Sequence, residues 1–419
     1  MSANISGSST PPEVSSAVAS AAGSPPKIVV QKYGGSSVAD VAGVQRVARR
    51  VVDTVEAGYR VAVVISAMGE TTDVLLGLAK EVSTSPPRRE LDMLVTAGER
   101  IASALLAMAI HELGHEAVSF TGSQCGIITS DRHTNARILE VRPYRVQDEL
   151  DAGRVVIIAG YQGVSYKREV TTLGRGGTDT TAVAMAAALR AEYCEICSDV
   201  DGVYSADPHV VAEPRHLSEL SYDEMEELSL HGAKVLNAQA VEYARRHRIL
   251  IYARATAGSD RMTRIAAPAE TRHGAMGVTG MDKLVRIQGR DGPKQLAALS
   301  QVLVDAQIAP LFARLEGGEA TIVIDAASCH DLSALEDALA QTGTLDVTHD
   351  VAAASVVGLG IGDDPSHLAA FLAVAAAEGV EIIGVDTAPL RLTLLTRPRF
   401  LQALQRALHR RFIEASVGE

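Results

Sequence analysis

The strongest constraint on the fold is a regular alternation of short apolar runs and helical segments between residues 27 and 254. Runs that are apolar throughout are typical of strands in a parallel sheet that helices cover on both faces. The pattern therefore predicts an α/β domain, an αβα sandwich with a mostly parallel central sheet. The expected strands are 27–33, 61–66, 117–120, 155–161 and 192–199, and the expected helices are 38–56, 91–113 and 179–191.

The last third of the chain contains a repeat. Asp291 matches Asp363 (363 − 291 = 72), and Pro293 matches Pro365 at the same offset. The sequence pattern of each copy predicts a strand, an Asp/Pro turn, a helix and a second strand. One such unit is small and leaves a sheet face open, so the two copies are expected to pack together.

Residues 1–26 differ from the rest of the chain. They are rich in Ser, Ala, Pro and Gly, and Glu13 is their single charged residue. Such a segment cannot bury enough surface to offset its chain entropy, so a disordered leader is expected. It lacks the basic start and apolar core of a signal peptide and the arginines of a transit peptide.

Composition narrows the class of protein. The net charge of −12 disfavours a nucleic-acid partner. The purely apolar runs fall short of the ~20 residues that a membrane-spanning helix needs. Four scattered cysteines are too few for a disulfide framework. We therefore expect a cytoplasmic protein without a membrane partner.

Three glycine-bearing stretches follow expected strands: KYGGSS (32–37), SAMGETT (66–72) and TTLGRGGTDTTA (171–182). Glycine lets the backbone approach an anion closely, and a helix that begins near Thr178 and Asp179 would turn its positive end toward it. Any one of these loops alone is better explained as a capped turn. Three of them at strand ends of one sheet predict a ligand site, since ligands bind beyond the carboxyl ends of such strands.

The chemistry of the first loop points to phosphoryl transfer. None of the three stretches is a Walker A loop, because the lysine here precedes the glycines. Lys32 at a strand end could reach a transferring phosphoryl group as a point charge. Phosphoryl transfer needs mainly positioning and charge neutralisation, which lysines and Mg²⁺ supply better than a nucleophilic triad.

Two other motifs are expected to carry no chemistry. HELGH (111–115) matches a zinc-hydrolase pattern, but Gly114 falls where the long helix should end, so the two histidines need not share a face. CEIC (194–197) lies in an expected strand, where positions i and i+3 point to opposite faces. A redox pair of Cys194 and Cys197 is therefore not expected.

Seven stretches together resemble the bacterial aspartate kinases of the amino acid kinase fold. They occur in consistent order between residues 27 and 254, and the resemblance is highly specific. The C-terminal repeat is similar to the paired ACT domains that carry feedback control in that family, with much less agreement in sequence. The stretches are QKYGGSSV, VVISAMGETTDVLL, DMLVTAGERIASALLAMAI, SFTGSQCGIIT, VTTLGRGGTDTTAVAMAAAL, EICSDVDGVYSADPHVV and HGAKVL.

The resemblance implies a division of the chain and a partner. A homodimer formed through the ACT-like domains is the expected minimum assembly. The implied parts are a leader (1–26), an amino acid kinase domain (27–264), a linker (265–282) and two ACT-like domains (283–352 and 353–419).

The resemblance also implies the reaction, in which MgATP phosphorylates the β-carboxylate of L-aspartate to 4-phospho-L-aspartate. This is the first step toward lysine, threonine and methionine. No general base is needed, because a carboxylate is already a nucleophile near neutral pH. Mg²⁺ would be held mainly by phosphates and water, so no protein ligand for a metal is named.

Residue roles follow from matching the family motifs. Lys32 would stabilise the transferred phosphoryl group, and Asp179 would orient Lys32 or hold the substrate ammonium. Glu99 would pair with that ammonium and Arg175 with the α-carboxylate. The remaining aspartate-site residues would be Ser66, Thr71 and Gly176, and the remaining ATP-site residues would be Gly34, Gly35, Ser36, Ser198, Asp199, Tyr204, Asp207, His209 and Lys234.

The chain departs from the family pattern at three places. His209 stands where an arginine is expected near the ATP phosphates, and neutral histidine has no fixed charge. Ala309-Pro310 and Ala388-Pro389 stand where the family's effector sites commonly carry Asn-Ile and Ser-Glu. Proline has no amide donor for an amino-acid effector, so weakened inhibition by lysine and threonine is expected.

Two alternatives to an aspartate kinase stay open from the sequence. A kinase of the same fold could phosphorylate glutamate, carbamate or a related acid. A regulatory homologue could keep the fold without turnover, although intact Lys32, Glu99, Arg175 and Asp179 argue against it.

Overall fold

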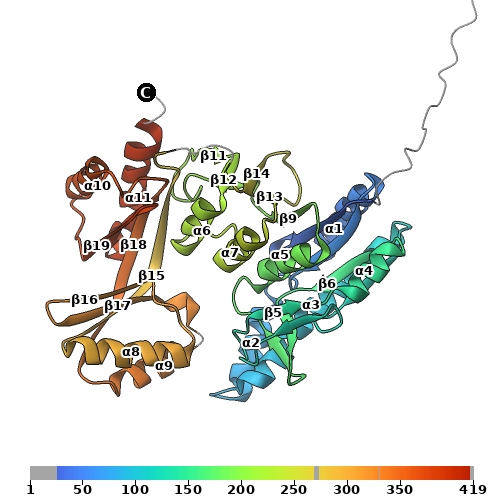
Figure 1. Ribbon diagram of the computed structural model, residues 1–419, viewed down its shortest axis with the longest axis horizontal. Helices are drawn as coiled ribbons and strands as arrows, with labels where there is room; N and C mark the ends of the chain where they lie inside the picture. The colour runs from blue at the N-terminus through green and yellow to red at the C-terminus, as the bar shows by residue number, and fades with distance from the viewer. Residues whose placement is uncertain (1–25, 269–272, 330, 416–419) are drawn as a thin grey trace, which may run out of the picture.

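The computed structural model describes residues 26–268, 273–329 and 331–415. The expected leader, residues 1–26, therefore lies outside the described residues except for Pro26. The kinase-like part occupies the right of Figure 1 and the C-terminal part the left.

A central sheet of eight strands organises the first part, in the order β12-β14-β13-β9-β1-β2-β6-β3. Neighbouring strands are parallel except for the antiparallel pair β13–β14. The α/β fold with a mostly parallel sheet is thus confirmed. The strands are β1 (Ile28–Tyr33), β2 (Arg60–Ile65), β3 (Ala117–Phe120), β6 (Val155–Ala159), β9 (Tyr193–Ser198), β12 (Glu219–Ser221), β13 (Ile251–Ala255) and β14 (Met262–Ala266).

Helices cover both faces of this sheet and bury two separate apolar cores. One core contains Val47 and Leu106 from the helices of the first face, and the other contains Met185 and Val241 from those of the second. Strands β1, β2, β3, β6 and β9 contribute side chains to both cores, because successive side chains of a strand alternate in direction. The first face is covered by α1 (Val41–Glu56) and α3 (Arg88–Glu112), and the second by α4 (Tyr144–Asp151), α5 (Gly177–Leu189), α6 (Tyr222–Leu230) and α7 (Ala238–His247).

The two cysteines of CEIC illustrate this alternation. Cys194 belongs to the core under α5, whereas Cys197 belongs to the core under α1 and α3. Both side chains are fully buried and free. The sheet therefore separates them, as the strand pattern predicted.

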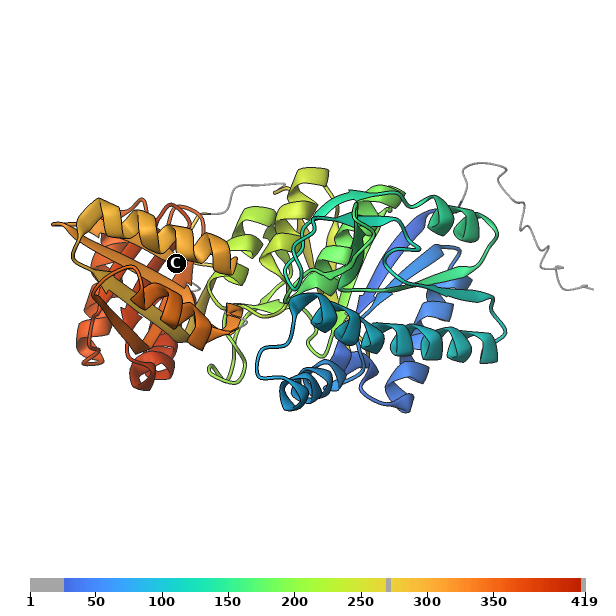
Figure 2. The same ribbon diagram turned by 90° about the horizontal axis from the view of Figure 1, so that it is seen from below.

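Helix α3 is, among the described residues, the one helix long and apolar enough to cross a membrane by length and composition. Its residues Leu106 and Ile110 are fully buried in the core beneath the sheet. Figure 2 shows α3 running along this face, with α2 (Thr71–Val82) beside it. Packing against the sheet therefore explains why one side of α3 is apolar. Glu99 belongs to the same helix.

A smaller sheet lies beside the central one, with the order β5-β4-β7-β8. Its strand β8 leads directly into the glycine stretch that precedes α5. This sheet therefore supports one wall of the region where the predicted site residues gather. Its strands are β4 (Ile127–Thr129), β5 (Ile138–Val141), β7 (Gln162–Ser165) and β8 (Val170–Thr172), and a separate hairpin pairs β10 (Val203–Tyr204) with β11 (His216–Leu217).

The C-terminal part is built on one antiparallel sheet of six strands, ordered β16-β17-β15-β18-β20-β19. The repeat extends beyond the residues that revealed it, because β16 begins at Phe312 and β19 at Gly384 (384 − 312 = 72). The elements are β15 (Gly277–Gly289), α8 (Gly292–Ala306), β16 (Phe312–Glu316), β17 (Glu319–Asp325), α9 (Leu332–Ala340), β18 (Leu345–Val357), α10 (Pro365–Ala377), β19 (Gly384–Ala388), β20 (Arg391–Thr396) and α11 (Pro398–His409).

Strands β15 and β18 are shared by the two repeat units. Strand β15 pairs with β18 along its whole length. On the other side of β15 its second half pairs with β17, and the last residues of β18 pair with β20. Three of the domain limits expected from sequence coincide with strands. The expected kinase-domain end at 264 falls inside β14, the expected linker 265–282 contains the first residues of β15, and the position 352/353 falls inside β18. No loop separates the units there, because the 13-residue strands run through both.

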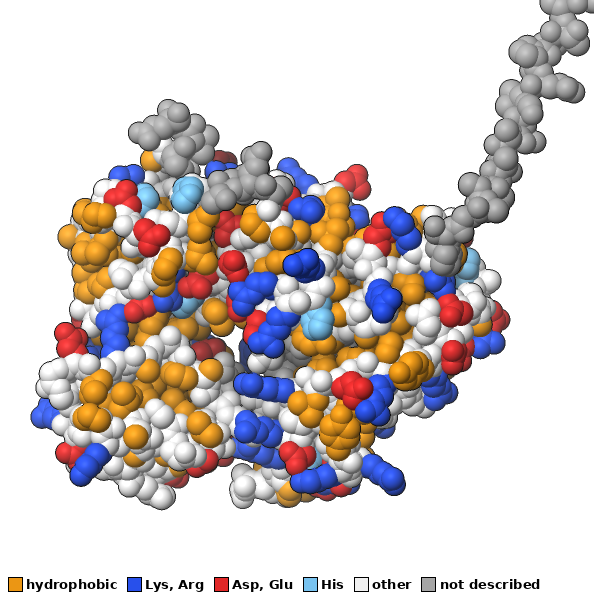
Figure 3. Space-filling model, viewed as in Figure 1, with side chains coloured by type: hydrophobic (Ala, Val, Ile, Leu, Met, Phe, Trp, Pro, Cys, Tyr) orange, Lys and Arg blue, Asp and Glu red, His pale blue; other side chains and the backbone are white. Residues whose placement is uncertain are grey.

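The two parts of the chain meet at several places, among them the contacts of Arg391 and of Asn135. Arg391 of β20, which is 8% exposed, donates to His231 Nε2 at 2.7 Å and lies 3.3 Å from Glu227 Oε1 of α6. Asn135 Nδ2 donates to the carbonyl oxygen of Gln307, just after α8, at 3.2 Å. Between the two parts, Figure 3 shows a hollow at which Lys and Arg side chains gather.

A buried carboxylate ties the sheet to α1. Glu195 of β9 is 4% exposed and accepts from Arg50 Nη2 at 3.1 Å, from Arg254 Nη1 at 3.0 Å and from Gln31 Nε2 at 2.9 Å. Its loss would leave two guanidinium groups without their anion.

Replacing Glu195 by alanine is therefore expected to lower the free energy of unfolding by about 3 kcal/mol, because breaking a buried ion pair leaves uncompensated charge. Urea unfolding followed by circular dichroism measures the change. Glu140→Ala is the control, since the Glu140 and Arg142 side chains are about half exposed and such pairs contribute less than about 1 kcal/mol. Equal effects of the two substitutions would contradict the prediction.

Candidate active site

Two of the three predicted glycine loops open at one edge of the central sheet. The third, TTLGRGGTDTTA, follows β8 of the smaller sheet, so the expectation that all three loops leave strands of one sheet is wrong. KYGGSS follows β1, SAMGETT follows β2 and Ser198 ends β9, and these three strands are parallel neighbours in the order β9-β1-β2. Their carboxyl ends therefore open at the same edge, where ligands of such sheets bind.

A lysine and a carboxylate form the centre of this edge. Lys32 Nζ lies 2.8 Å from Asp179 Oδ1, and the two side chains are 12% and 10% exposed. Asp179 stands in the first turn of α5, and its Oδ2 accepts from the backbone N–H of Asn237 at 3.2 Å. The lysine charge is thus held in a fixed position at the mouth of the glycine loop.

The glycine loop turns tightly around this lysine. A Cβ at Gly34 would lie 3.4 Å from Lys32 Nζ, and one at Gly35 would lie 2.9 Å from the carbonyl oxygen of Ala67. A larger residue at position 35 would therefore press on the second loop, whereas one at position 34 would contact the lysine. The chain then forms a short 3₁₀ helix, Gly35–Val38, which no side chain caps.

A hollow of about 180 Å³ opens beside the glycine loop. It brings together Ser36, Ser198 and Asp199, three residues expected on the nucleotide side. Arg46 of α1 and Thr256, after β13, also line it, and Thr256 Oγ1 lies 2.6 Å from Ser37 Oγ. Sequence analysis missed these two, since neither belongs to a glycine-bearing stretch.

Glu99 is the most unusual side chain of the region. It is 3% exposed, and burial raises the pKa of its carboxyl to about 7 although the Ala67 N–H donates to Oε1 at 3.3 Å. Its second oxygen, Oε2, is buried and has no hydrogen-bond partner in the described residues. A buried polar atom without a partner is costly, and a bound cation would satisfy it.

The other residues expected around aspartate lie in two segments, the one that follows β2 and the one that precedes α5. Ser66 Oγ donates to Thr178 Oγ1 at 3.1 Å, and Thr71 Oγ1 donates to the carbonyl oxygen of Met68 at 2.5 Å. Arg175 is exposed, and its backbone carbonyl accepts from Asn237 Nδ2 at 3.2 Å. Gly176 has φ 74°, and a Cβ there would lie 2.2 Å from Asn237 Nδ2, so the turn requires glycine.

Of the ten residues expected at ATP, only Ser36, Ser198 and Asp199 line the hollow; Lys32, Gly34 and Gly35 precede Ser36 in the glycine loop, and four more lie outside the lining. Tyr204 OH donates to Asp201 Oδ1 at 2.5 Å. Asp207 Oδ1 accepts from both the backbone N–H and Nδ1 of His209 at 2.9 Å, and the His209 side chain is 93% exposed. Lys234 is also exposed.

The zinc-like motif does not form a metal site. Helix α3 ends at Glu112, and Gly114 has φ 84°. His111 Nε2 then lies 2.9 Å from the Ala117 carbonyl oxygen, whereas His115 pairs with Glu56 at 3.4 Å. Within the described parts of the chain, no three His, Cys, Asp or Glu side chains are grouped to hold a metal ion.

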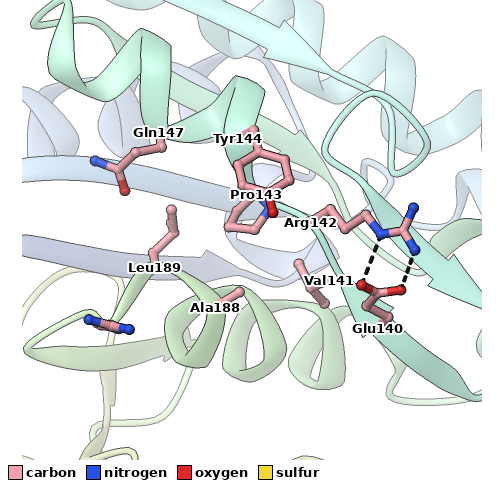
Figure 4. Close-up of a pocket in the computed structure, with 9 residues that line it drawn as sticks. Glu140, Val141, Arg142, Pro143, Tyr144, Gln147, Ala188 and Leu189 are labelled. Carbon is pink, nitrogen blue, oxygen red and sulfur yellow. Dashed lines mark hydrogen bonds and ion pairs between the residues drawn. The ribbon is translucent and has the colours of Figure 1, made fainter.

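A larger hollow, of about 460 Å³, lies elsewhere on the same domain. Figure 4 shows it between the C-terminal end of α5, at Leu189, and the segment that carries Tyr144. Glu140 and Arg142 form a two-pronged ion pair at its rim, at 2.8 and 2.7 Å. It contains none of the predicted site residues and lies at the opposite end of α5 from Asp179.

Comparisons with known proteins agree with this picture. The model of the amino acid kinase family matches residues 27–253. An aspartokinase of Mycolicibacterium smegmatis is 43% identical over 405 residues, covering 92% of this chain and 96% of the relative. One of Corynebacterium glutamicum is 44% identical over 403 residues, with the same coverage.

A solved structure shows the same architecture. E. coli aspartokinase III in complex with aspartate and ADP superposes with a TM-score of 0.81 at 22% identity, covering 91% of this chain and 99% of that one. This likeness concerns the fold, while the curated relatives extend it to sequence over most of the chain. The chain belongs to the aspartokinases of the amino acid kinase family.

Proposed function

We propose that this chain transfers the γ-phosphoryl group of MgATP to the β-carboxylate of L-aspartate. Two observations carry the proposal: Lys32 pairs with Asp179 at the carboxyl edge of the sheet, and Glu99 Oε2 is buried with no hydrogen-bond partner among the described residues. A zwitterionic amino acid needs one fixed anion and one cation. Glu99 supplies the anion, and the exposed Arg175 can turn its guanidinium onto the α-carboxylate.

The reaction needs little covalent chemistry from the protein. A β-carboxylate oxygen forms a bond to the γ-phosphorus while the bond to the bridging oxygen breaks, and ADP leaves with the electron pair. Lys32 would neutralise charge on the transferring group. Asp179 holds Lys32 at 2.8 Å, so the ammonium is in place before the reaction begins.

The nucleotide would lie over the glycine loop and extend into the hollow beside Ser36, Ser198 and Asp199. Gly34 and Gly35 allow phosphate oxygens to approach the backbone closely. Mg²⁺ would neutralise the phosphates and be held by them and by water, as is usual for this ion. Tyr204, Asp207, His209 and Lys234 would reach the nucleotide from the rim.

A substrate panel tests the proposal. The purified chain is incubated with MgATP and, in separate reactions, aspartate, glutamate and carbamate, and ADP release is followed. ADP release that depends on aspartate is expected. Release with glutamate or carbamate alone would favour another acylphosphate-forming kinase, and no coupling to any acid would favour a regulatory homologue.

Weakened feedback inhibition belongs to the same proposal. Pro310 is exposed between α8 and β16, and Pro389 stands in the turn between β19 and β20. Neither can donate a backbone hydrogen bond to an amino-acid effector. Turnover is expected to persist in the presence of lysine, threonine or both. Strong inhibition by either at sub-millimolar concentration would contradict this.

Replacing His209 by arginine is expected to lower the KM for ATP. The exposed ring carries no fixed charge, whereas a guanidinium could reach a phosphate from the same rim position. Steady-state kinetics at saturating aspartate measure the change. His247→Arg, an exposed substitution at the end of α7, is the control. An unchanged or raised KM for ATP in the His209 variant would contradict the prediction.

The assembly and compartment are part of the proposal as well. A homodimer through the ACT-like sheets is expected, because the six-stranded sheet ends in β16 and β19 as open edges within the described residues. Light scattering on the purified chain tests it. Four free cysteines fit a reducing cytoplasm.

A further inference from the structure

Helix α3 carries a stripe of four buried polar residues, of which sequence analysis singled out only Glu99. Asp92, Thr96, Glu99 and Ser103 follow one another at spacings of four, three and four residues, so they share one face of the helix. Glu99 is the expected partner of the substrate ammonium. Asp92 lies two turns before it and is completely buried.

The Asp92 carboxylate collects hydrogen bonds from two separate segments. Its Oδ1 accepts from Thr172 Oγ1 at 2.6 Å and from the Thr134 N–H at 3.0 Å. Its Oδ2 lies 2.6 Å from His133 Nδ1 and 3.2 Å from the Thr134 nitrogen. A buried carboxylate is retained where its oxygens are satisfied, and here that satisfaction joins α3 to β8 and to the segment 133–135.

The segment that Asp92 holds has a strained backbone. Thr134 has φ 67°, a left-handed conformation that β-branched residues rarely adopt. Such a conformation persists only when its surroundings fix it. The hydrogen bond from the Thr134 N–H to Asp92 is one contact that does so.

This strained segment lies against the loop that carries Arg175. A Cβ at Gly174 would lie 3.0 Å from Asn135 Oδ1 and 3.5 Å from the Thr134 carbonyl oxygen. The Ala136 N–H donates to the Thr172 carbonyl at 2.8 Å, directly before the same loop. The backbone of residues 173–176 is therefore held from one side by residues that Asp92 keeps in place.

We infer that Asp92 is a positioning residue of the aspartate site, which fixes the loop of Arg175 relative to Glu99 through Thr134 and Thr172. The inference rests on the proposed function. Asp92 touches no substrate. It sets the spacing between the two groups that receive the amino acid's opposite charges, and this spacing matters for aspartate but not for ATP.

The test is the kinetics of Asp92→Asn in the full chain. The amide keeps the shape but presents N–H groups to donors, so the contacts to Thr134 and Thr172 are lost in part. The KM for aspartate is expected to rise about ten-fold or more, because small misplacements of binding groups have large effects. The KM for ATP is expected to stay within about two-fold. An unchanged KM for aspartate, or an equal rise in both KM values, would overturn the inference.

Two further variants keep the test decisive if Asp92→Asn folds poorly. Thr172→Val removes one donor to Asp92 isosterically and is expected to raise the KM for aspartate several-fold. Thr96→Val is the matched control, since its buried hydroxyl donates only within α3, to the Met93 carbonyl, and it should leave that KM unchanged. Equal values for the two threonine variants would contradict the inference.

A second substitution that restores activity distinguishes a positioning role of Asp92 from a general loss of folding. Glycine adopts a positive φ without strain, so Thr134→Gly in the Asp92→Asn background is expected to recover at least a third of the lost aspartate affinity. Failure of this rescue would contradict the role assigned to Thr134. Wild-type turnover with aspartate, measured in the same series, tests the proposed function separately, because only its absence counts against the activity itself.

Discussion

Replacing Lys32 by methionine is expected to lower kcat for aspartate phosphorylation by roughly 10³-fold, the usual effect of removing one charge that stabilises a transferring group. Methionine keeps the length of the side chain but not the charge that Asp179 holds at 2.8 Å. The KM for aspartate should change much less, because Glu99 and Arg175 are untouched. Initial rates over a range of both substrates measure the change.

Lys27→Met is the matched control for this substitution. Lys27 immediately precedes the same strand at its other end, pairs with Glu192 at 2.5 Å and is 67% exposed. Its kcat should equal that of the wild type. A Lys32 variant that retained more than about a tenth of the wild-type kcat would exclude a central part for this lysine in transition-state stabilisation.

Replacing Glu99 by glutamine is expected to raise the KM for aspartate roughly 100-fold, since the substrate ammonium would lose a buried anionic partner. The KM for ATP should not change. Glu112→Gln, an exposed substitution on the last turn of α3, is the control and should leave both values as they are. If the Glu99 variant kept the wild-type affinity for aspartate, Glu99 would not be the partner of the substrate ammonium.

The pH dependence of the wild type gives a second measure of Glu99. Its pKa is about 7, and only the ionised form attracts the ammonium, so kcat/KM for aspartate should rise with pH through about 7. This step should disappear in Glu99→Gln. A wild-type profile that is flat between pH 6 and 8 would contradict the assignment.

The contribution of Glu99 to the free energy of unfolding should fall as the pH rises, whereas kcat/KM for aspartate should rise. Burial raises the pKa of Glu99 above its unfolded value, so the folded state binds the proton more tightly. The stability that this proton contributes is full at low pH and is lost as the pH rises to about 7. Glu99→Gln should therefore have a higher Tm than the wild type at pH 8, with the difference shrinking toward pH 5.

Much of the kinase-like half was predictable because its local patterns agree with its tertiary structure. Strands such as β1 and β2 are buried on both faces, so a continuous apolar run is enough to predict them. The end of α3 near Gly114 and the opposite directions of Cys194 and Cys197 were predicted for the same reason. In each case a local pattern decided the outcome.

The rest depended on contacts between distant segments. No local pattern indicates that β15 and β18 pair along their whole length and so run through both repeat units. Asn237 supports both Asp179 and Arg175 from a loop before α7, and no motif marks it. Asp92 looked like an ordinary residue near the start of a helix until the fold placed it against Thr134 and Thr172.

The most direct test of the central claim is to trap the product of the purified chain with hydroxylamine in the presence of MgATP and L-aspartate. The account predicts that aspartyl β-hydroxamate forms with the wild type and falls roughly 10³-fold with Lys32→Met. Absence of the hydroxamate from the wild type, or its undiminished formation by the Lys32 variant, would contradict it.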